Sequence, residues 1–372
     1  MNRALQYILF YGIFFFVFFG MHLYVFCRLN RSFNVSRPVL FSAIVILALT
    51  FPVCTLLEKF FPSMITMLFY TLASIWLGVL FLLLSVLLVS EPVRLFFSLD
   101  SRAAGLCIVG VVLLLSGYGL INAVHPQVKT ITVPIAGLKE TLRLVQLSDI
   151  HVGTIHNSGY LTKVVNTTNA LQPDMVLITG DLFDGIGPVS RRTVAPLGKL
   201  RAKTFFVSGN HEKYYGIDKV AAVMENTGAV FLRNQVVRYG GLQIAGVDYP
   251  ERENQKANPV VGKLALDGAL PSILMYHPPA GTNEAAEAGI DLQLSGHTHA
   301  GQLFPFTLLV KLFFPYTDGL HRLGNMHLYV SAGTGTWGPP MRLGSRSEIT
   351  LIRLIPIPDR RVQHPFEDAL KK

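Results

Sequence analysis

Hydrophobic residues are unevenly distributed along this 372-residue chain, in long runs before residue 125 and short runs after it. Each of the four long runs approaches the roughly 20 apolar residues that a helix needs to cross a bilayer. The expected transmembrane helices lie at about 5–26, 39–57, 64–89 and 105–124. Buried soluble helices are the alternative, but four such runs leave too little polar surface for a soluble domain.

The composition supports this membrane region and gives it a direction. The chain is 51% hydrophobic and 15% charged, against about 25% charged residues in soluble domains. Five arginines fall on the first and third connections, while Arg3, Lys59 and Lys129 fall on the opposite side. The five are Arg28, Arg31, Arg37, Arg94 and Arg102. Because positive loops stay in the cytoplasm, we expect a multi-pass protein of a bacterial plasma membrane with its C-terminal domain outside the cytoplasm.

After residue 125 the pattern changes to short apolar runs separated by Gly-, Asp- and Asn-rich turns. Strands are expected at 142–147, 175–178, 204–207, 242–245, 273–276, 291–294, 328–330 and 348–354, and helices at 159–171 and 217–226. This alternation predicts an α/β domain whose helices cover the faces of a sheet. We expect four segments: the membrane region 1–124, a linker 125–141, the α/β domain 142–354 and a tail 355–372.

Charge and cysteine content exclude two classes of site. The net charge is +9, but no dense Lys/Arg run with interleaved aromatic residues occurs, so we expect no nucleic-acid partner. The three cysteines all lie at or before position 107. A cysteine-based metal site is therefore impossible in the C-terminal domain.

Five polar clusters follow apolar strand-like runs in this domain. They are Ser148-Asp149-Ile150-His151, Gly180-Asp181-Leu182-Phe183-Asp184, Gly209-Asn210-His211-Glu212, His277, and Gly296-His297-Thr298-His299. Loops at strand ends are where α/β folds place their sites. One Asp or His near a turn is usually a cap, but five clusters in this arrangement indicate a shared metal site. Carboxylate, amide oxygen and imidazole ligands without thiolate suit Mn, Fe or Zn.

These motifs resemble the calcineurin-like metallophosphoesterase family, and in detail its YkuE-type branch of bacterial phosphohydrolases. The resemblance is carried by SDIH at 148–151, GD at 180–181, GNHE at 209–212, His277 and GHTH at 296–299. Further support comes from GHTHAGQ at 296–302, GLHR at 319–322 and the run at 333–350. The resemblance implies a central β-sandwich flanked by helices, with no departure at the metal-binding positions.

The resemblance also implies roles for individual residues. Asp149, His151 and His299 would hold a first metal ion, Asn210, His277 and His297 a second, and Asp181 would bridge the two. His211 would stay off the metals and face the substrate as the catalytic residue. Arg322 and Arg342 are candidates for binding substrate phosphate. A surface or structural role is an equally favoured alternative for both.

Two metal ions suit the hydrolysis of a phosphate ester or pyrophosphate. Ions about 3.5–4 Å apart can hold a bridging hydroxide and lower the pKa of water from about 15.7 to about 7. We expect attack by that hydroxide on a phosphate-containing, amphiphilic substrate such as a lipid or cell-envelope phosphate. A soluble-nucleotide phosphodiesterase or broad phosphatase is the alternative, and a non-catalytic membrane sensor or scaffold is less favoured. The sequence leaves the oligomeric state open.

An apolar stretch at 303–316 follows His299 directly. It is too short to span a bilayer. Either it is a buried helix or loop of the core, or it forms an apolar lip beside the metals that touches lipid. The lipid bilayer is the partner expected for the membrane region in both cases.

Overall fold

The chain folds into two units. The computed structural model describes residues 3–96, 100–250 and 260–357, without the side chains of 3–11, 14, 94 and 95. A helical unit comprises Met1–Ile121 together with Gly338–Leu343. The second unit comprises Asn122–Trp337 and Gly344–Lys372, of which residues 358–372, most of the predicted tail, lie outside the described residues.

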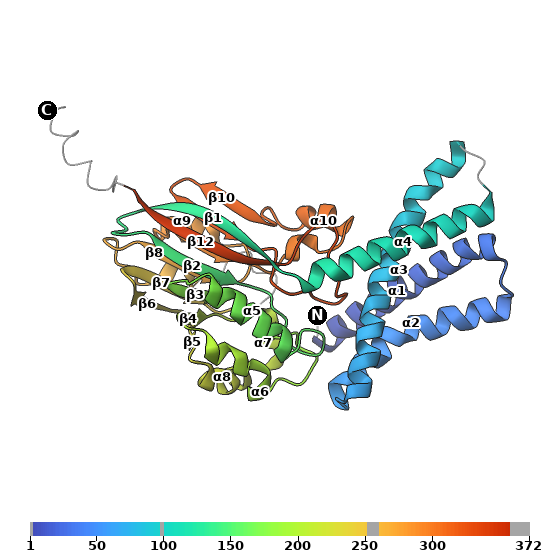
Figure 1. Cartoon of the computed structure of the whole chain (residues 1–372), viewed down its shortest axis with the longest axis horizontal. Helices are drawn as coiled ribbons and strands as arrows, with labels where there is room; N and C mark the ends of the chain where they lie inside the picture. Colours follow the sequence, from blue (N-terminus) through green and yellow to red (C-terminus); the bar gives the residue numbers. More distant parts are fainter. Residues whose placement is uncertain (1–2, 97–99, 251–259, 358–372) are drawn as a thin grey trace. The chain divides into compact units, whose positions relative to one another are not determined.

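Four helices form the N-terminal region (Figure 1): α1 (Arg3–Phe33), α2 (Arg37–Phe60), α3 (Met64–Phe96) and α4 (Ser101–Val124). Within the described residues, three helices are long and apolar enough to cross a membrane, at Arg37–Phe60, Met64–Val93 and Ser101–Val124. Three of the four expected spans are thus found among the described residues. The expected span at 5–26 lies in α1, where several side chains are outside the described residues.

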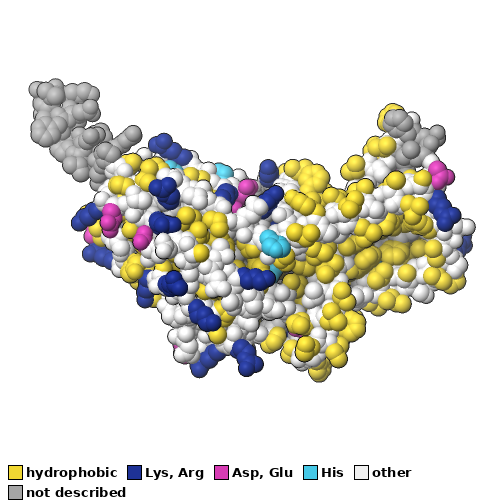
Figure 2. Space-filling view, viewed as in Figure 1, with side chains coloured by type: hydrophobic (Ala, Val, Ile, Leu, Met, Phe, Trp, Pro, Cys, Tyr) yellow, Lys and Arg dark blue, Asp and Glu magenta, His cyan; other side chains and the backbone are white. Residues whose placement is uncertain are grey.

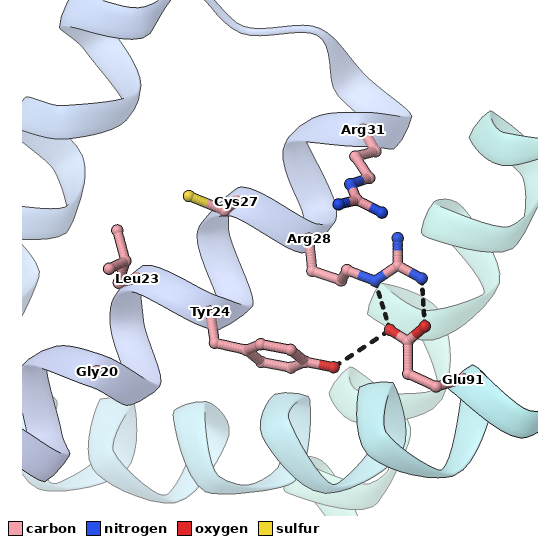
Figure 3. A pocket seen from close by; sticks show the side chains of 7 residues that line it. All are labelled: Gly20, Leu23, Tyr24, Cys27, Arg28, Arg31 and Glu91. Atoms are coloured by element: carbon pink, nitrogen blue, oxygen red, sulfur yellow. Dashed lines mark hydrogen bonds and ion pairs between the residues drawn. The ribbon is translucent and has the colours of Figure 1, made fainter.

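Polar side chains inside the helical unit are paired with one another. Arg28 forms a two-pronged ion pair with Glu91, and the Tyr24 hydroxyl donates to the same carboxylate at 3.2 Å. Figure 3 shows these side chains lining a pocket between α1 and α3, with Arg31 beside them. Charged groups among apolar helices need such partners because isolated charges are costly there.

The second unit is built on two six-stranded sheets. The first has the order β1-β12-β2-β3-β4-β5 and the second the order β10-β11-β9-β8-β7-β6. The first-sheet strands are β1 (Gln127–Ala136), β2 (Leu142–Leu147), β3 (Met175–Ile178), β4 (Lys203–Phe206), β5 (Val230–Phe231) and β12 (Glu348–Ile357). The second-sheet strands are β6 (Gln235–Tyr239), β7 (Leu242–Val247), β8 (Ser272–Tyr276), β9 (Leu292–Ser295), β10 (Gly319–Leu323) and β11 (Met326–Val330).

Helices cover the outer faces of the two sheets. They are α5 (Ser158–Ala170), α6 (Arg191–Val194) and α8 (Ile217–Met224) on the first sheet and α9 (Thr282–Glu287) on the second. Two further short helices, α7 (Asn210–Tyr215) and α10 (Phe306–Leu309), lie in the segments that follow β4 and β9. Short 3₁₀ turns join them: η1 (Ala195–Lys199), η2 (Glu225–Thr227), η3 (Val261–Lys263), η4 (His299–Gly301) and η5 (Val310–Leu312). The expected α/β sandwich with flanking helices is confirmed.

Three apolar layers hold this sandwich together. Between the sheets, Leu144, Leu177 and Phe205 pack with Ile273 and Leu294. A second layer joins the outer face of the first sheet to α5, α6 and α8, and a third joins the second sheet to α9 and η3. Strands such as β3 and β8 are buried along their whole length. This burial on both faces explains why their sequences are continuously apolar rather than alternating.

The segment predicted to be a linker, 125–141, contains β1, which pairs in parallel with β12 from Gln127 to Ala136. Its inward side chains include Val133 and Ile135, both buried in the layer between the sheets. The alternation of these apolar residues with exposed ones is the strand pattern of a half-buried edge. This segment is therefore part of the sheet.

Candidate metal centre

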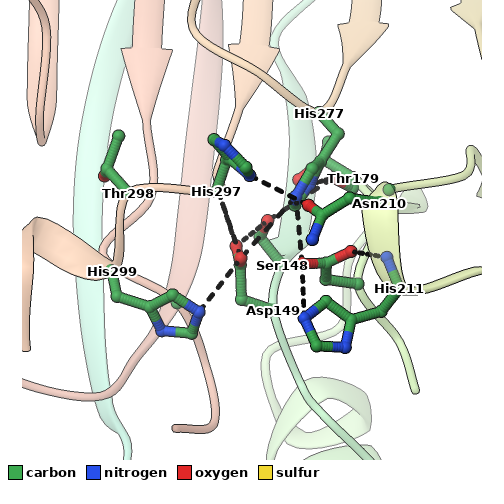
Figure 4. A network of polar contacts seen from close by, with 12 residues as sticks. Ser148, Asp149, Thr179, Asn210, His211, His277, His297, Thr298 and His299 are labelled. Carbon is green, nitrogen blue, oxygen red and sulfur yellow. Dashed lines mark hydrogen bonds and ion pairs between the residues drawn. The ribbon is translucent and has the colours of Figure 1, made fainter. Parts of the chain in front are cut away.

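The seven candidate metal ligands all follow the carboxyl ends of strands. Within the first sheet β2, β3 and β4 run parallel, and within the second sheet β8 and β9 run parallel. The side chains are Asp149 and His151 after β2, Asp181 after β3, Asn210 after β4, His277 after β8, and His297 and His299 after β9. Parallel strands end at the same edge of a sheet, so the fold brings these distant segments together (Figure 4).

Five of the seven candidate ligands have a left-handed backbone conformation, which sets the direction of their side chains. Asp149, His151, Asp181, His297 and His299 have φ between 49° and 74°, a region that non-glycine residues rarely occupy. Each such residue costs about 1–3 kcal/mol and persists only where the surroundings hold it. The Asp149 amide donates to the Gly180 carbonyl at 3.0 Å, and the His151 amide donates to the Asp181 carbonyl at 3.1 Å. This concentration of strain marks a functional site.

One cluster consists of Asp149, His151 and His299, whose ligand atoms lie within 4.8 Å of one another. The Nε2 atoms of His151 and His299 are 3.0 Å apart, and the Oδ1 of Asp149 lies 3.4 Å from the Nε2 of His299. The Ser148 hydroxyl donates to Asp149 Oδ2 at 2.5 Å, and the His297 amide donates to the same carboxylate at 3.1 Å. These bonds fix the direction of the carboxylate.

A second cluster consists of Asp181, His277 and His297, again with ligand atoms within 4.8 Å of one another. Asn210 joins it, because its Oδ1 lies 3.0 Å from the Nδ1 of His297. The Nδ1 of His277 donates to the Thr179 carbonyl at 2.8 Å, since a carbonyl can only accept. The Nε2 of neutral His277 is thus a lone-pair donor directed at the cluster.

Asp181 lies between the two clusters. Its Oδ2 is 3.2 Å from the Nε2 of His277 and 3.9 Å from the Nε2 of His151. Burial alone would raise the pKa of Asp181, but the charges of His277 and His211 hold it well below its usual value. Asp181 is therefore an ionised carboxylate that reaches imidazoles of both clusters.

Two of the histidines, the half-buried His297 and the buried His151, are held neutral. Burial, with the charge of His277 adding to it, lowers the pKa of His297 to about 4. Burial and the charge of His211 hold the pKa of His151 well below its ordinary value. The neutral imidazole is the form that binds a metal ion.

The pKa values of His277 and Asp149 are raised, whereas those of His297 and His151 are lowered. Burial disfavours a charged His277, but the carboxylates of Asp181 and Asp149 raise its pKa to about 10. Burial raises the pKa of Asp149 to about 6, although the charge of His277 lowers it. His277 Nε2 lies 3.2 Å from Asp181 Oδ2 and 3.9 Å from Asp149 Oδ1. A buried nitrogen facing two carboxylates in this way fits a divalent cation.

His211 lies at the start of α7 beside both clusters. Its amide donates to Asp181 Oδ1 at 2.9 Å, and its Nδ1 donates to the Asp184 carbonyl at 2.7 Å. Its Nε2 is 3.9 Å from Asp181 Oδ2. His211 also forms, with His151 and Asp181, a third group of side chains that could hold a metal ion. Distance alone does not keep His211 off a metal, so its separate catalytic role stays a prediction.

Sequence reasoning missed the role of Glu212. This buried carboxylate accepts hydrogen bonds from the amides of Gly209 at 2.6 Å, Asp181 at 2.9 Å and Phe183 at 3.1 Å. Burial, and then the charge of Asp181, raises its pKa to about 7. The signal was a glutamate three residues after the N-cap Gly209 of α7, the spacing at which an acidic residue caps a helix.

The two candidate phosphate-binding arginines lie in different units. Arg322, in β10, is exposed, and its Nε donates to the Gly324 carbonyl at 3.2 Å in the turn to β11. Arg342 belongs to the helical unit, where its side chain is fully buried and its amide donates to the Gly119 carbonyl at 2.9 Å. The phosphate-binding role of both arginines stays a prediction.

Comparisons with known proteins identify the family of this site. Residues 142–301 match the model described as calcineurin-like phosphoesterase. A metallophosphoesterase of Helicobacter pylori is 38% identical over 272 residues, which cover 69% of this chain and 74% of that protein. The chain belongs to the calcineurin-like metallophosphoesterase family. This metallophosphoesterase is accordingly a metal-dependent hydrolase of phosphoesters.

Two further relatives match the metallophosphoesterase. The metallophosphoesterase YkuE of Bacillus subtilis is 30% identical over 231 residues, covering 57% of this chain and 78% of YkuE. A Bos taurus transmembrane protein with metallophosphoesterase domain is 38% identical over 271 residues, covering 66% of this chain and 61% of that protein. The match thus spans less than two thirds of the bovine relative. Together with the three apolar helices, it indicates that the metallophosphoesterase is a membrane protein.

Proposed function

We propose that this enzyme holds two divalent metal ions and hydrolyses a phosphate ester or pyrophosphate between them. The first ion would be held by Asp149, His151 and His299, the second by Asn210, His277 and His297, with Asp181 bridging both. The observation that carries this proposal is the position of Asp181 Oδ2, 3.2 Å from His277 Nε2 in one cluster and 3.9 Å from His151 Nε2 in the other. Mn, Fe or Zn fits the donor set.

A pair of bound divalent ions supplies Lewis acidity and a hydroxide nucleophile at neutral pH. The protein's own part is to hold its side chains in fixed directions. The hydrogen bond from the His211 amide fixes one oxygen of Asp181, which leaves the second oxygen facing the imidazoles. Because His211 Nδ1 donates to the Asp184 carbonyl, Nε2 is the ring nitrogen that faces outward. In the proposed reaction, the ring carries a second proton on Nε2, which passes to the leaving oxygen while Nδ1–H stays bonded to the Asp184 carbonyl.

The proposed substrate is an amphiphilic phosphate, such as a lipid or cell-envelope phosphate. The three apolar helices support this choice, because they keep the enzyme where such substrates are concentrated. Soluble nucleotides are the competing substrates, and an assay of both classes decides between them. A larger kcat/KM for nucleotides than for lipid phosphates would reject the amphiphilic assignment.

The membrane is proposed to be a bacterial plasma membrane, with the catalytic unit outside the cytoplasm. The support is the excess of arginine on the first and third connections of the helical region. This orientation would present the metal centre to phosphates of the cell envelope.

The test of the metal-dependent reaction is an Asp181→Asn variant of the full-length enzyme. Asparagine keeps the size of the side chain but loses the charge that reaches both clusters. We expect the rate of hydrolysis of a chromogenic phosphodiester with Mn²⁺ to fall by more than about a hundredfold. Changing a residue that only supports a metal ligand costs up to about a hundredfold, and Asp181 is itself a proposed ligand. Metal content measured by mass spectrometry is expected to fall with it.

Asp218→Asn is the matched control, because Asp218 is an exposed residue in the first turn of α8. It is expected to keep the activity and metal content of the wild-type enzyme. Background-level rates in the wild type and the Asp181→Asn variant alike would favour a non-catalytic sensor or scaffold.

A further inference from the structure

The stretch after His299 forms a folded, apolar projection. We call residues 304–313, which include α10 and η5, the apolar lip. Six of its large hydrophobic side chains are between 43% and 79% exposed: Phe304, Phe306, Leu308, Leu309, Leu312 and Phe313. Figure 2 shows hydrophobic side chains gathered where Figure 1 places α10. Soluble proteins rarely expose so many large apolar residues together.

The lip is held in one conformation by its own backbone. Leu303 and Val310 anchor it as buried side chains. The Leu308 amide donates to the Pro305 carbonyl at 2.9 Å, and the Phe313 amide donates to the Val310 carbonyl at 3.1 Å. The exposure of its apolar side chains is therefore a property of a folded element.

Both ends of the lip adjoin the metal centre. After the lip, the Phe314 ring packs edge-on against His297, with centroids 5.5 Å apart. Before it, the Gln302 side chain exchanges two hydrogen bonds of 3.0 Å with the main chain of Trp337. The Trp337 ring is 58% exposed, and its centroid lies 6.3 Å from that of His211. The lip thus borders the candidate ligands and the candidate catalytic histidine.

Composition indicates which partner the lip takes. Lys311 is its single charged residue, surrounded by Phe and Leu. Apolar side chains with a basic residue and a nearby tryptophan are typical of segments that lie in a membrane interface. The chain carries its own apolar helices, so lipid is the apolar partner always present at high local concentration.

We propose that the apolar lip inserts into the acyl-chain region of the bilayer beside the metal centre. Phosphates at the membrane surface then reach the metal ligands without leaving the lipid. This role deepens the proposed function and rests on it for the choice of substrate, but insertion itself does not depend on catalysis.

Tryptophan fluorescence tests the insertion directly, because Trp76 and Trp337 are the two tryptophans of the chain. In a Trp76→Phe, Trp337→Phe background, Leu312→Trp places a single probe on the lip. The control Tyr239→Trp places the probe on β6, at a residue that is 38% exposed. The full-length protein is reconstituted in phosphatidylcholine–phosphatidylglycerol vesicles, with and without bromine on the acyl chains.

We expect brominated acyl chains to quench most of the fluorescence at position 312 and little at position 239. Equal quenching at the two positions would overturn the proposal. Shielding of position 312 from both brominated lipid and aqueous iodide would also overturn it, and would indicate that a second copy or another protein covers the lip. If position 312 is quenched but the protein shows no metal-dependent hydrolysis, the insertion of the lip would be supported and the proposed function would be rejected.

A second measurement links the lip to turnover. The Leu312→Ser, Phe313→Ser double variant replaces two exposed apolar side chains of the lip with small polar ones, which removes the area that would be buried in lipid. The ratio of lipid-phosphate turnover to soluble-diester turnover is expected to fall at least about tenfold. Tyr239→Ser is expected to leave this ratio at the wild-type value. An unchanged ratio in the double variant would contradict a role of the lip in lipid access.

Discussion

At the residue scale, hydrogen bonds to neighbouring backbone decide which atom each functional side chain offers. His277 gives its Nδ1 proton to the Thr179 carbonyl, and His211 gives its Nδ1 proton to the Asp184 carbonyl. Each imidazole therefore turns its Nε2 toward Asp181, at 3.2 Å and 3.9 Å respectively. Metal-binding histidines characteristically use one nitrogen for the metal and the other for such a support.

Metal binding is expected to strengthen as pH rises. In the metal-free protein the pKa of His277 is raised to about 10, above the ordinary value of about 6.5. The protonated ring stabilises the metal-free fold fully below pH 6.5, and that contribution is lost as pH rises through 10. A metal ion must displace this proton, so its affinity increases as pH rises toward 10.

Calorimetry in buffers of different ionisation enthalpy measures this effect. At pH 7.5 we expect Mn²⁺ binding to release protons, and a His277→Gln variant to release fewer. Metal binding without proton release at pH 7.5 would contradict the raised pKa of His277.

Removing the carboxylate of Glu212 should destabilise the catalytic unit. Glu212→Ala leaves the amides of Gly209, Asp181 and Phe183 without their acceptor. An unmade buried hydrogen bond costs about 1–3 kcal/mol, so we expect a loss of about 3 kcal/mol or more. The temperature of unfolding, followed by near-UV circular dichroism in detergent, should fall clearly. Glu212→Gln keeps one acceptor oxygen and should lose less, and equal values for the two variants would argue against this role.

At the element scale, strand ends place the chemistry. Parallel strands of both sheets finish at turns in which glycine lets two segments approach closely. A Cβ at Gly209 would lie 2.1 Å from Asp181 Oδ1, and one at Gly296 would lie 1.9 Å from Ser148 Oγ. These glycines leave room for the carboxylates of the opposite segment, so the two sheets can share one site.

Gly296→Ala is expected to weaken metal binding because the new methyl would also lie 2.2 Å from Asp149 Oδ2. Asp149 must then move away from His299, its partner in the first cluster. We expect metal affinity, measured by competition with a chelating dye, to fall about tenfold or more. Gly262→Ala is the control, since a Cβ there meets nothing within 4 Å. Equal affinities in both variants would show that the turn tolerates the methyl group.

At the scale of the whole molecule, the chain combines apolar helices with a phosphoesterase unit. The three membrane-spanning candidates have mean hydropathies of 2.5, 2.7 and 2.3. The unit that follows is a sandwich with three buried apolar layers of its own. In the proposed function, anchoring would restrict the substrate by location, while the metal centre would determine the chemistry.

The orientation of the catalytic unit can be measured with reporters fused to the C-terminus. The arginine distribution predicts active alkaline phosphatase and dark green fluorescent protein in a bacterial host. A fluorescent green fluorescent protein fusion together with an inactive alkaline phosphatase fusion would place the catalytic unit in the cytoplasm. An odd number of spans would produce that result if the N-terminus lies outside.

The sequence by itself determined the family, the candidate ligand clusters and the strands that precede them. Continuous apolar runs, followed by glycine, aspartate and histidine, predicted β2, β3 and β8 almost to the residue. Local patterns suffice for these features because a strand buried on both faces must be apolar along its length. The edge strand β1 escaped notice because its exposed half resembles a linker.

Tertiary structure alone decided how the segments meet. That His151 and His299 face each other at 3.0 Å depends on two sheets ending at one place. That Glu212 holds the amide of Asp181 depends on the parallel pairing of β3 and β4 within the first sheet. It also decided that the apolar stretch after His299 is an exposed lip rather than a core helix. Hydrophobicity does not distinguish these outcomes, because burial depends on which other elements happen to pack against a segment.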